Sequence, residues 1–228
     1  MDKTKNNGFF ALFALSRFSS GVKTNLLLGL CLFTFGTCLE IATRGRNVVG
    51  GFFLTMIFFV LGQQLVTLDT STLVQSSTYR KKLQLYYPYM ASLPGLFLMY
   101  TLLIMLHIWM IAHPAEGISL SQNYQIQTSY IAGLGMYLFA GELFFGFCYK
   151  YYIQATIGLL ICLIPINILT ENDYVRLSGY LGNTLTAAVI TGYLFVIAGA
   201  ILSMIFSNLL YRKPMSTIAF KGIFAKKQ

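Results

Sequence analysis

Residues 48–67 read VVGGFFLTMIFFVLGQQLVT, twenty positions without one charged side chain. About 20 mainly apolar residues are enough for an α-helix to cross the hydrocarbon core of a bilayer. Five further runs of this kind occur along the chain, at 25–42, 90–112, 130–149, 151–170 and 182–210. The sequence therefore predicts an all-α membrane protein with six transmembrane helices.

The composition of the whole chain supports a membrane protein. Hydrophobic residues make up 56% of the chain and charged residues only 10%, whereas about a quarter of the residues in a soluble domain are charged. The 228 residues accommodate six crossings with short connections but no additional soluble domain of ordinary size. The formal charge of +9 comes from cations at the edges of the apolar runs, so we expect no nucleic-acid partner.

The residues that most often carry chemistry are sparse. Four cysteines lie in apolar runs without CxxC or Cys/His spacing, and we interpret them as small buried hydrophobic side chains: Cys31, Cys38, Cys148 and Cys162. The only histidines, His107 and His113, lie near one end of the third span, and the single tryptophan, Trp109, marks an aromatic belt there. We expect no disulfide and no catalytic, cofactor-binding or metal-binding residue.

The distribution of cations predicts the orientation. Thirteen Lys and Arg residues fall on one side of the six spans, and three, Arg44, Arg46 and Arg176, fall on the other. Loops rich in Lys and Arg stay in the cytoplasm, so both termini are predicted to be cytoplasmic. Residues 1–24 are then predicted to form a cytoplasmic N-terminus with an interfacial amphipathic helix. Residues 25–210 form the transmembrane domain, which includes an external loop at 113–129, and residues 211–228 form a basic cytoplasmic tail.

The longest cytoplasmic connection, about 69–89, lies within the sequence LDTSTLVQSSTYRKKLQLYYPYMA at 68–91. From Ser77 to Tyr87 its spacing predicts a short amphipathic helix, and Pro88 allows the chain to bend before the third span. The cations can serve as a simple positive-inside anchor. The length of the segment also allows a docking helix that receives motion from a partner.

The segment QSSTYRKKLQL at 75–85, together with the six-span architecture, resembles the permease subunit of a bacterial type-2 ABC exporter. The resemblance implies that this segment is a coupling helix that contacts a separate ATP-binding subunit. It assigns that contact to the following residues: Ser77, Tyr79, Arg80, Lys81, Lys82 and Leu83. The chain itself has no GxxxxGK[ST] pattern, so it is not expected to be an enzyme, and ATP and Mg²⁺ belong to the partner.

The resemblance further implies a location in the bacterial cytoplasmic membrane and a dimer of this chain with a second copy or a homologous permease. The expected cargo is a hydrophobic or amphipathic substrate, such as a peptide, an antimicrobial or a small drug, moved out of the cell. Two alternatives are a substrate-binding membrane component of a vitamin importer and an intramembrane enzyme. The long basic loop disfavours the first, and the lack of a nucleophile or ligand set disfavours the second.

Two sets of residues within the spans are candidates for a functional or packing role. Glu142 lies in the fourth span, and helical spacing puts Gly135, Gly146 and Tyr149 on its side. An ionisable group in a membrane is a functional candidate, so this face is either a translocation path or gate, or the place of an interhelical hydrogen bond. The last span carries a stripe of small residues that we assign to helix packing: Ala188, Gly192, Gly199 and Ser203.

Overall fold

The computed structural model describes residues 22–68, 80–171, 176–182, 184–213 and 216. The described residues form helices and no strand. The helices are α2 (Val22–Thr43), α3 (Val49–Leu68), α5 (Arg80–Leu85), α6 (Tyr87–Ala112), α7 (Leu120–Cys148), α8 (Tyr152–Glu171), α9 (Leu177–Tyr180) and α10 (Leu185–Leu210).

Six of these helices are long and apolar enough to cross a membrane: α2, α3, α6, α7, α8 and α10. The prediction of an all-α protein with six transmembrane helices is confirmed. A helix satisfies its own backbone hydrogen bonds, which is why such apolar runs are helical in lipid. The interfacial helix predicted within residues 1–24 falls almost entirely outside the described residues, which begin at Val22, and the cytoplasmic orientation of the termini stays a prediction.

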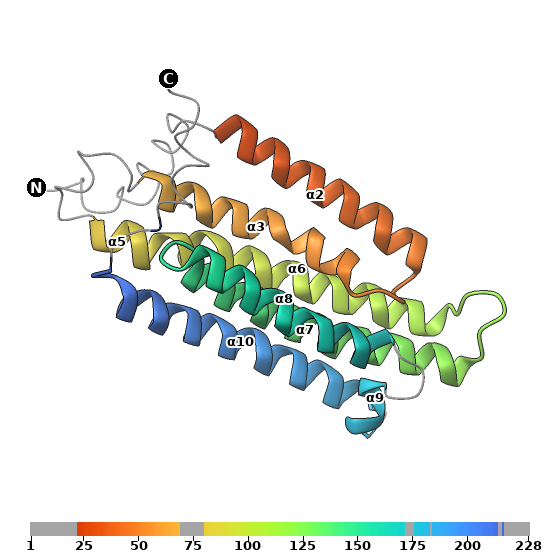
Figure 1. The fold of residues 1–228 in the computed structure, drawn as a ribbon. Coiled ribbons are helices and arrows are strands. Elements are labelled where there is room, and N and C mark those ends of the chain that lie inside the picture. Colours follow the sequence, from red (N-terminus) through yellow and green to blue (C-terminus); the bar gives the residue numbers. More distant parts are fainter. Residues whose placement is uncertain (1–21, 69–79, 172–175, 183, 214–215, 217–228) are drawn as a thin grey trace, which may run out of the picture.

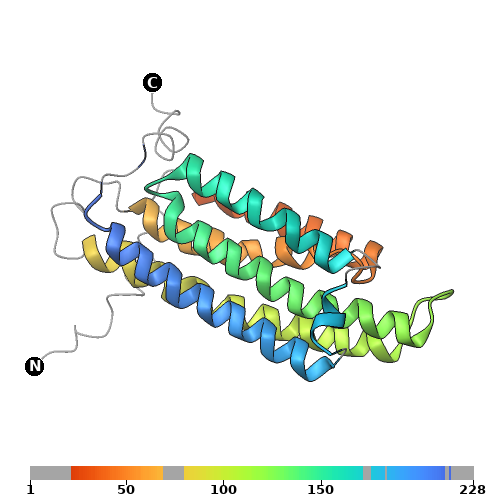
Figure 2. The same ribbon diagram turned by 60° about the horizontal axis from the view of Figure 1, so that its bottom comes forward.

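Helix α7 occupies the middle of the bundle (Figures 1 and 2). It packs against α10, α8, α6 and α3. In its most apolar stretch of 18 residues, 72% of the residues are buried. By contrast, α2 packs mainly on α3, and α8 packs mainly on α7. In the corresponding 18-residue stretch of α8, only 6% of the residues are buried. Two of the six spans therefore present most of their apolar surface outward, where lipid or another subunit can cover it.

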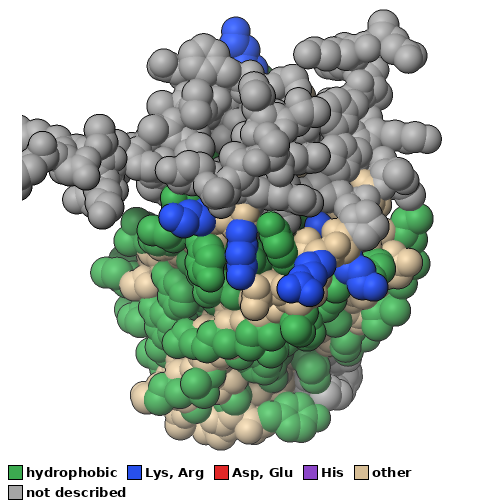
Figure 3. Space-filling view, turned by 90° about the vertical axis from the view of Figure 1, so that its left-hand side faces the viewer, with side chains coloured by type: hydrophobic (Ala, Val, Ile, Leu, Met, Phe, Trp, Pro, Cys, Tyr) green, Lys and Arg blue, Asp and Glu red, His purple; other side chains and the backbone are tan. Residues whose placement is uncertain are grey.

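The two ends of the bundle differ in their connections. We call one the basic end, because α2 begins there, α10 ends there, and Lys and Arg side chains ring it (Figures 1 and 3). Its described cations are Lys23, Lys81, Lys82, Lys150, Arg212 and Lys213. We call the other the loop end; it carries the α2–α3 turn, the 113–119 connection and α9. Arg44, Arg46 and Arg176 lie at this end.

The loop predicted for 113–129 is shorter than expected, because α7 already begins at Leu120. The side chain of Ser119 caps the helix by accepting a hydrogen bond from the backbone N–H of Gln122 at 3.2 Å. The segment is polar, but Asn123 and Gln127 are buried and hydrogen-bonded to other helices. Hydropathy assigns these polar residues to a loop, because it does not show that their side chains form hydrogen bonds inside the protein.

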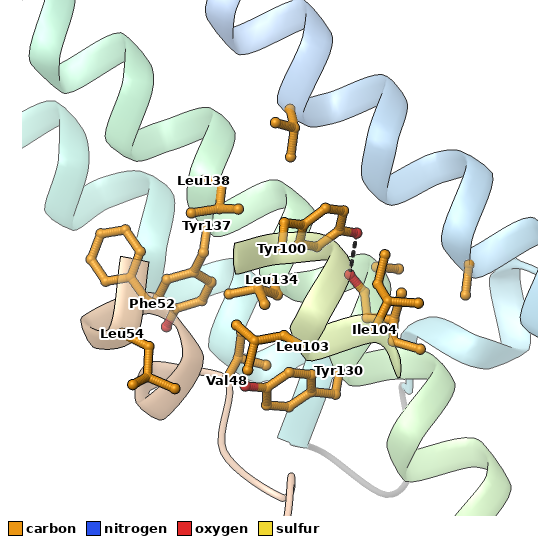
Figure 4. Close-up of a cluster of buried hydrophobic side chains, with 14 of the residues drawn as sticks. Val48, Phe52, Leu54, Tyr100, Leu103, Ile104, Tyr130, Leu134, Tyr137 and Leu138 are labelled. Carbon is orange, nitrogen blue, oxygen red and sulfur yellow. Dashed lines mark hydrogen bonds between the residues drawn. The ribbon is translucent and has the colours of Figure 1, made fainter. Parts of the chain in front are cut away.

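The core lies where α3, α6 and α7 meet (Figure 4). Aromatic side chains fill much of it: the rings of Phe52 and Tyr137 meet edge to face at 5.3 Å. The hydroxyl of Tyr100 donates to the carbonyl of Ile131 at 2.9 Å, which satisfies the one polar atom of a ring that is otherwise fully enclosed. The core thus joins apolar packing to specific interhelical hydrogen bonds.

The cysteines do not follow the prediction that all four are buried. All four are free, and only Cys148 is buried; Cys31, Cys38 and Cys162 lie on the outside of the bundle. The reason is the solvent: the outer surface of a transmembrane helix faces lipid and is itself apolar, so a small hydrophobic side chain has no preference for the core.

Candidate functional site

A cluster of buried polar side chains lies near the loop end, between three spans. We call it the Glu40 cluster: Glu40 of α2, His107 of α6, and Gln127 and Tyr130 of α7. Each is at most 3% exposed. Ionisable groups buried in a membrane protein are costly and are found where they have partners or a function.

Glu40 is the centre of the cluster. One of its oxygens, Oε1, lies 3.0 Å from Nε2 of His107, and the other, Oε2, accepts a hydrogen bond from the hydroxyl of Tyr130 at 2.6 Å. The rings of His107 and Tyr130 stack with their centroids 3.6 Å apart. A single carboxylate therefore joins α2 to both α6 and α7.

Gln127 determines which ring nitrogen of His107 carries a proton. Its Nε2 donates to the carbonyl oxygen of Arg44 at 3.2 Å, so its Oε1 is the atom that faces Nδ1 of His107 at 2.5 Å. An amide oxygen only accepts, so Nδ1 must donate. The other ring nitrogen, Nε2, lies within ion-pair distance of Glu40 Oε1, so the carboxyl group and the imidazole are buried against each other.

The backbone of the α2–α3 turn covers this cluster closely. Gly45 has φ +75°, and a Cβ at this position would lie 2.6 Å from Cε1 of His107. Gly51, in the first turn of α3, is equally close: a Cβ there would lie 2.2 Å from the hydroxyl of Tyr130. Glycine permits the left-handed backbone at position 45 and the close approach at both positions. The turn and the cluster are thus one packed unit.

A cavity of about 390 Å³ opens at the loop end and reaches this unit at Gln127. Its walls come from the end of α2 and the following turn, the end of α6, the 113–119 connection and the start of α7: Ala42, Thr43, Arg44, Arg46, Met110, His113, Ala115, Ile118, Asn123, Ile126 and Gln127. A second cavity of about 290 Å³ shares Arg46, Ile118 and Ile126 with it and continues to Glu171 and Arg176.

Sequence reasoning did not find the Glu40 cluster. It assigned His107 to an aromatic belt, whereas the side chain is fully buried. A signal was nevertheless present: Glu40 and His107 are ionisable residues inside predicted spans, and both lie near the same predicted end of the bundle. An ionisable residue within a span predicts a partner on another span.

Glu142, the candidate from the fourth span, lies elsewhere, in the contact between α7 and α10. It is 2% exposed, and neither carboxyl oxygen has a hydrogen-bond partner among the described residues. A Cβ at Gly199 would lie 2.1 Å from Glu142 Oε2. The carboxyl group is therefore pressed against the backbone of α10, and it lines neither of the two cavities at the loop end.

The small residues predicted on these two faces meet one another in one register. The backbone of Gly135 lies against Gly192, and Gly146 lies against Ser203, on either side of the Glu142–Gly199 contact. Ala188 is fully buried in the same helix α10. Small residues let two backbones approach closely, which favours van der Waals packing in lipid. Tyr149 ends this face as the C-cap of α7, with its ring edge-on to Phe145 at 5.6 Å.

The predicted coupling segment is described in part. Ser77 and Tyr79 lie outside the described residues; Arg80 and Leu83 lie within α5, and the side chains of Lys81 and Lys82 are exposed. Helix α5 contacts α3, α6 and α10, and Leu85 at its end is 6% exposed. The predicted bend is a single-residue interruption at Tyr86, and Pro88 falls in the first turn of α6, where its missing N–H costs nothing.

Sequence reasoning also missed Tyr89, at the start of α6. Its hydroxyl shares hydrogen bonds with Ser203 and Ser207 of α10, at 2.7 and 2.6 Å. This tyrosine therefore connects the chain immediately after α5 to the helix that packs along α7.

Within the described part of the chain, no three His, Cys, Asp or Glu side chains gather closely enough to hold a metal ion. Comparison with known proteins adds no relative: no family model, no curated protein and no solved structure matches the chain. The chain is a multi-pass membrane protein by its six apolar helices, and its function has to be inferred from its own residues.

Proposed function

We propose that the chain is the membrane-spanning permease subunit of an ATP-driven exporter, with ATP and Mg²⁺ bound by a separate cytoplasmic ABC ATPase subunit. The observation that carries the proposal is the position of α5. This short basic helix presents Lys81 and Lys82 outward at the basic end and packs on α3, α6 and α10. A partner that moves α5 therefore acts on three spans at once.

A route for this motion runs through α10. Tyr89 links the start of α6 to Ser203 and Ser207, and α10 packs against α7 through Gly192, Gly199 and Ser203. Small residues let the two backbones approach closely, and we propose that the two helices shift along each other at this contact. Glu142 lies in this contact without a hydrogen-bond partner among the described residues. We propose that it gains one in another conformation, as part of a path or gate.

The proposed assembly contains a second permease, either another copy or a homologue. The outward apolar faces of α2 and α8 leave surface for such a partner or for lipid. The proposed cargo is a hydrophobic or amphipathic peptide, antimicrobial or drug, because so apolar a membrane domain suits molecules that enter it from the bilayer. The proposed location is the bacterial cytoplasmic membrane, with the basic end in the cytoplasm.

Copurification tests the proposal. The full chain is purified with an affinity tag from its native membrane, and we expect a soluble ABC ATPase to copurify in a stable complex whose ATP hydrolysis responds to the membrane subunit. The double change Lys81→Glu/Lys82→Glu should abolish the complex, because it reverses two exposed charges on α5. The matched control Arg212→Glu/Lys213→Glu makes the same charge change at the same end and should retain the complex. Full activity of the α5 variant would refute the coupling role.

A further inference from the structure

The arginines of the α2–α3 turn have no role in the proposed exporter mechanism. Arg44 and Arg46 lie at the loop end, opposite α5, and the positive-inside rule disfavours cations on that side. Both side chains are exposed, and both line the cavity of about 390 Å³. What the cavity could bind follows from its walls.

The turn that carries the two arginines is held in place by buried groups. Arg44 has φ +47°, a conformation that is unfavourable for a residue with a side chain and persists only where the surroundings impose it. Here Gln127 donates to the Arg44 carbonyl, and Gly45 lies directly against His107. The two guanidinium groups are thus attached to a backbone that the Glu40 cluster positions in advance.

The lining of this cavity is cationic and rich in hydrogen-bonding groups. Arg44 and Arg46 supply its positive charge, His113 adds a hydrogen-bonding ring, and no Asp or Glu is among the described residues of its wall. Thr43 also lines it, and its hydroxyl is buried without a hydrogen-bond partner among the described residues. The adjoining cavity adds Arg176, balanced by Glu171. Walls of Met110, Ile118 and Ile126 are apolar, and low polarity around a cation strengthens its attraction for an anion.

We propose that this cavity binds a phosphate group through Arg44 and Arg46, carried by an anionic lipid headgroup or by a small soluble compound. Guanidinium groups match phosphate oxygens with paired hydrogen bonds. The volume of about 390 Å³ accommodates a phosphate together with a small organic part. The inference goes beyond the exporter proposal and does not depend on it, since neither α5 nor an ATPase takes part.

The single tryptophan of the chain is a built-in reporter for this site. Trp109 is 52% exposed, and its ring stacks on that of His113, a cavity residue, with centroids 4.5 Å apart. The full-length protein is placed in phosphatidylcholine vesicles, and Trp109 quenching by brominated phosphatidylglycerol is compared with quenching by brominated phosphatidylcholine. In a second arm, sodium phosphate is titrated against chloride at equal ionic strength while Trp109 emission is recorded.

If the phosphate belongs to a lipid, phosphatidylglycerol should bind more tightly than phosphatidylcholine, by about fivefold for each arginine engaged. If it belongs to a soluble compound, phosphate should shift Trp109 emission with saturation and chloride should not. In Arg44→Gln/Arg46→Gln either response should disappear. The matched pair Arg212→Gln/Lys213→Gln, at the opposite end, should retain it.

Absence of both responses in the wild-type protein would overturn the proposal, and so would a response that the arginine variant retains. If the double variant does not fold, the same two measurements on the single variant Arg46→Gln test the proposal. Its side chain is exposed and lines both cavities, so its loss should weaken binding about fivefold while the fold persists. Because neither measurement involves an ATPase, its result does not depend on whether the exporter proposal is correct.

Discussion

Two buried glutamates differ in the side chains that surround their carboxyl groups. Glu40 is 3% exposed and meets His107 and Tyr130. Glu142 is 2% exposed, and its oxygens find no hydrogen-bond partner among the described residues. Burial alone therefore does not tell the role of an intramembrane carboxyl group. A carboxyl group that contacts polar side chains of two other helices stabilises one arrangement of helices, whereas one without such contacts leaves room for another arrangement.

The surroundings of the two residues agree with this distinction. Around Glu40, three spans are joined by directional contacts that a small shift would break. Around Glu142, α7 and α10 meet through small residues in one register, and this is the contact at which we propose that the two helices shift. We infer that the loop end is the rigid part of the bundle and that the α7–α10 contact is its adjustable part.

The largest effect should follow from His107→Ala. This change removes the partner of Glu40 and of Gln127 and leaves a carboxyl group buried without its neighbour. Breaking a buried pair in this way costs about 3–5 kcal/mol in the free energy of unfolding. Titration of the protein with sodium dodecyl sulfate in mixed micelles, followed by far-ultraviolet circular dichroism, measures it.

His113→Ala is the matched control for that change. His113 is an exposed histidine on the same α6 end, and its ring contacts only Trp109 among the described rings. Its loss should change the free energy of unfolding by no more than about 0.5 kcal/mol. Equal stability of the two variants would mean that the Glu40 cluster does not hold the loop end together.

Gly199→Ala should have the next largest effect. The added methyl group would lie 2.1 Å from Glu142 Oε2 and 2.9 Å from the Cα of Phe139, so α7 and α10 must separate. Overpacking of this kind costs about 1–3 kcal/mol. Gly158→Ala, on α8 with nothing within 4 Å of the new atom, is the control and should be neutral in the same unfolding titration. A neutral Gly199→Ala would show that the α7–α10 contact is looser than its geometry indicates.

These contacts also separate what the sequence could predict from what it could not. Five of the six spans were located to within about three residues at each end, because hydropathy over 20 residues is a strong signal. The start of α7 was placed ten residues too late, because Asn123 and Gln127 look like loop residues until their partners on other helices are known.

The Glu40 cluster shows the same limit at the level of a site. Glu40 and His107 are 67 positions apart in the chain, and no spacing rule within one helix links them. By contrast, the Gly192–Gly199–Ser203 stripe was predictable because its period lies within a single helix. Helix-internal patterns are visible in a sequence, whereas the choice of partner helix depends on packing.

The smallest effect is expected for Glu142→Met, and it tests the comparison most directly. Methionine is close to glutamate in length and flexibility, so it can occupy the same space beside Gly199. A carboxyl group without partners contributes no hydrogen bond to lose, so stability should change by less than about 1 kcal/mol or increase. Glu40→Met, the same substitution, should cost about 2 kcal/mol or more, because His107 and Tyr130 each lose their partner. Equal losses in the unfolding titration would place Glu142 among the structural residues and remove the reason for regarding the α7–α10 contact as adjustable.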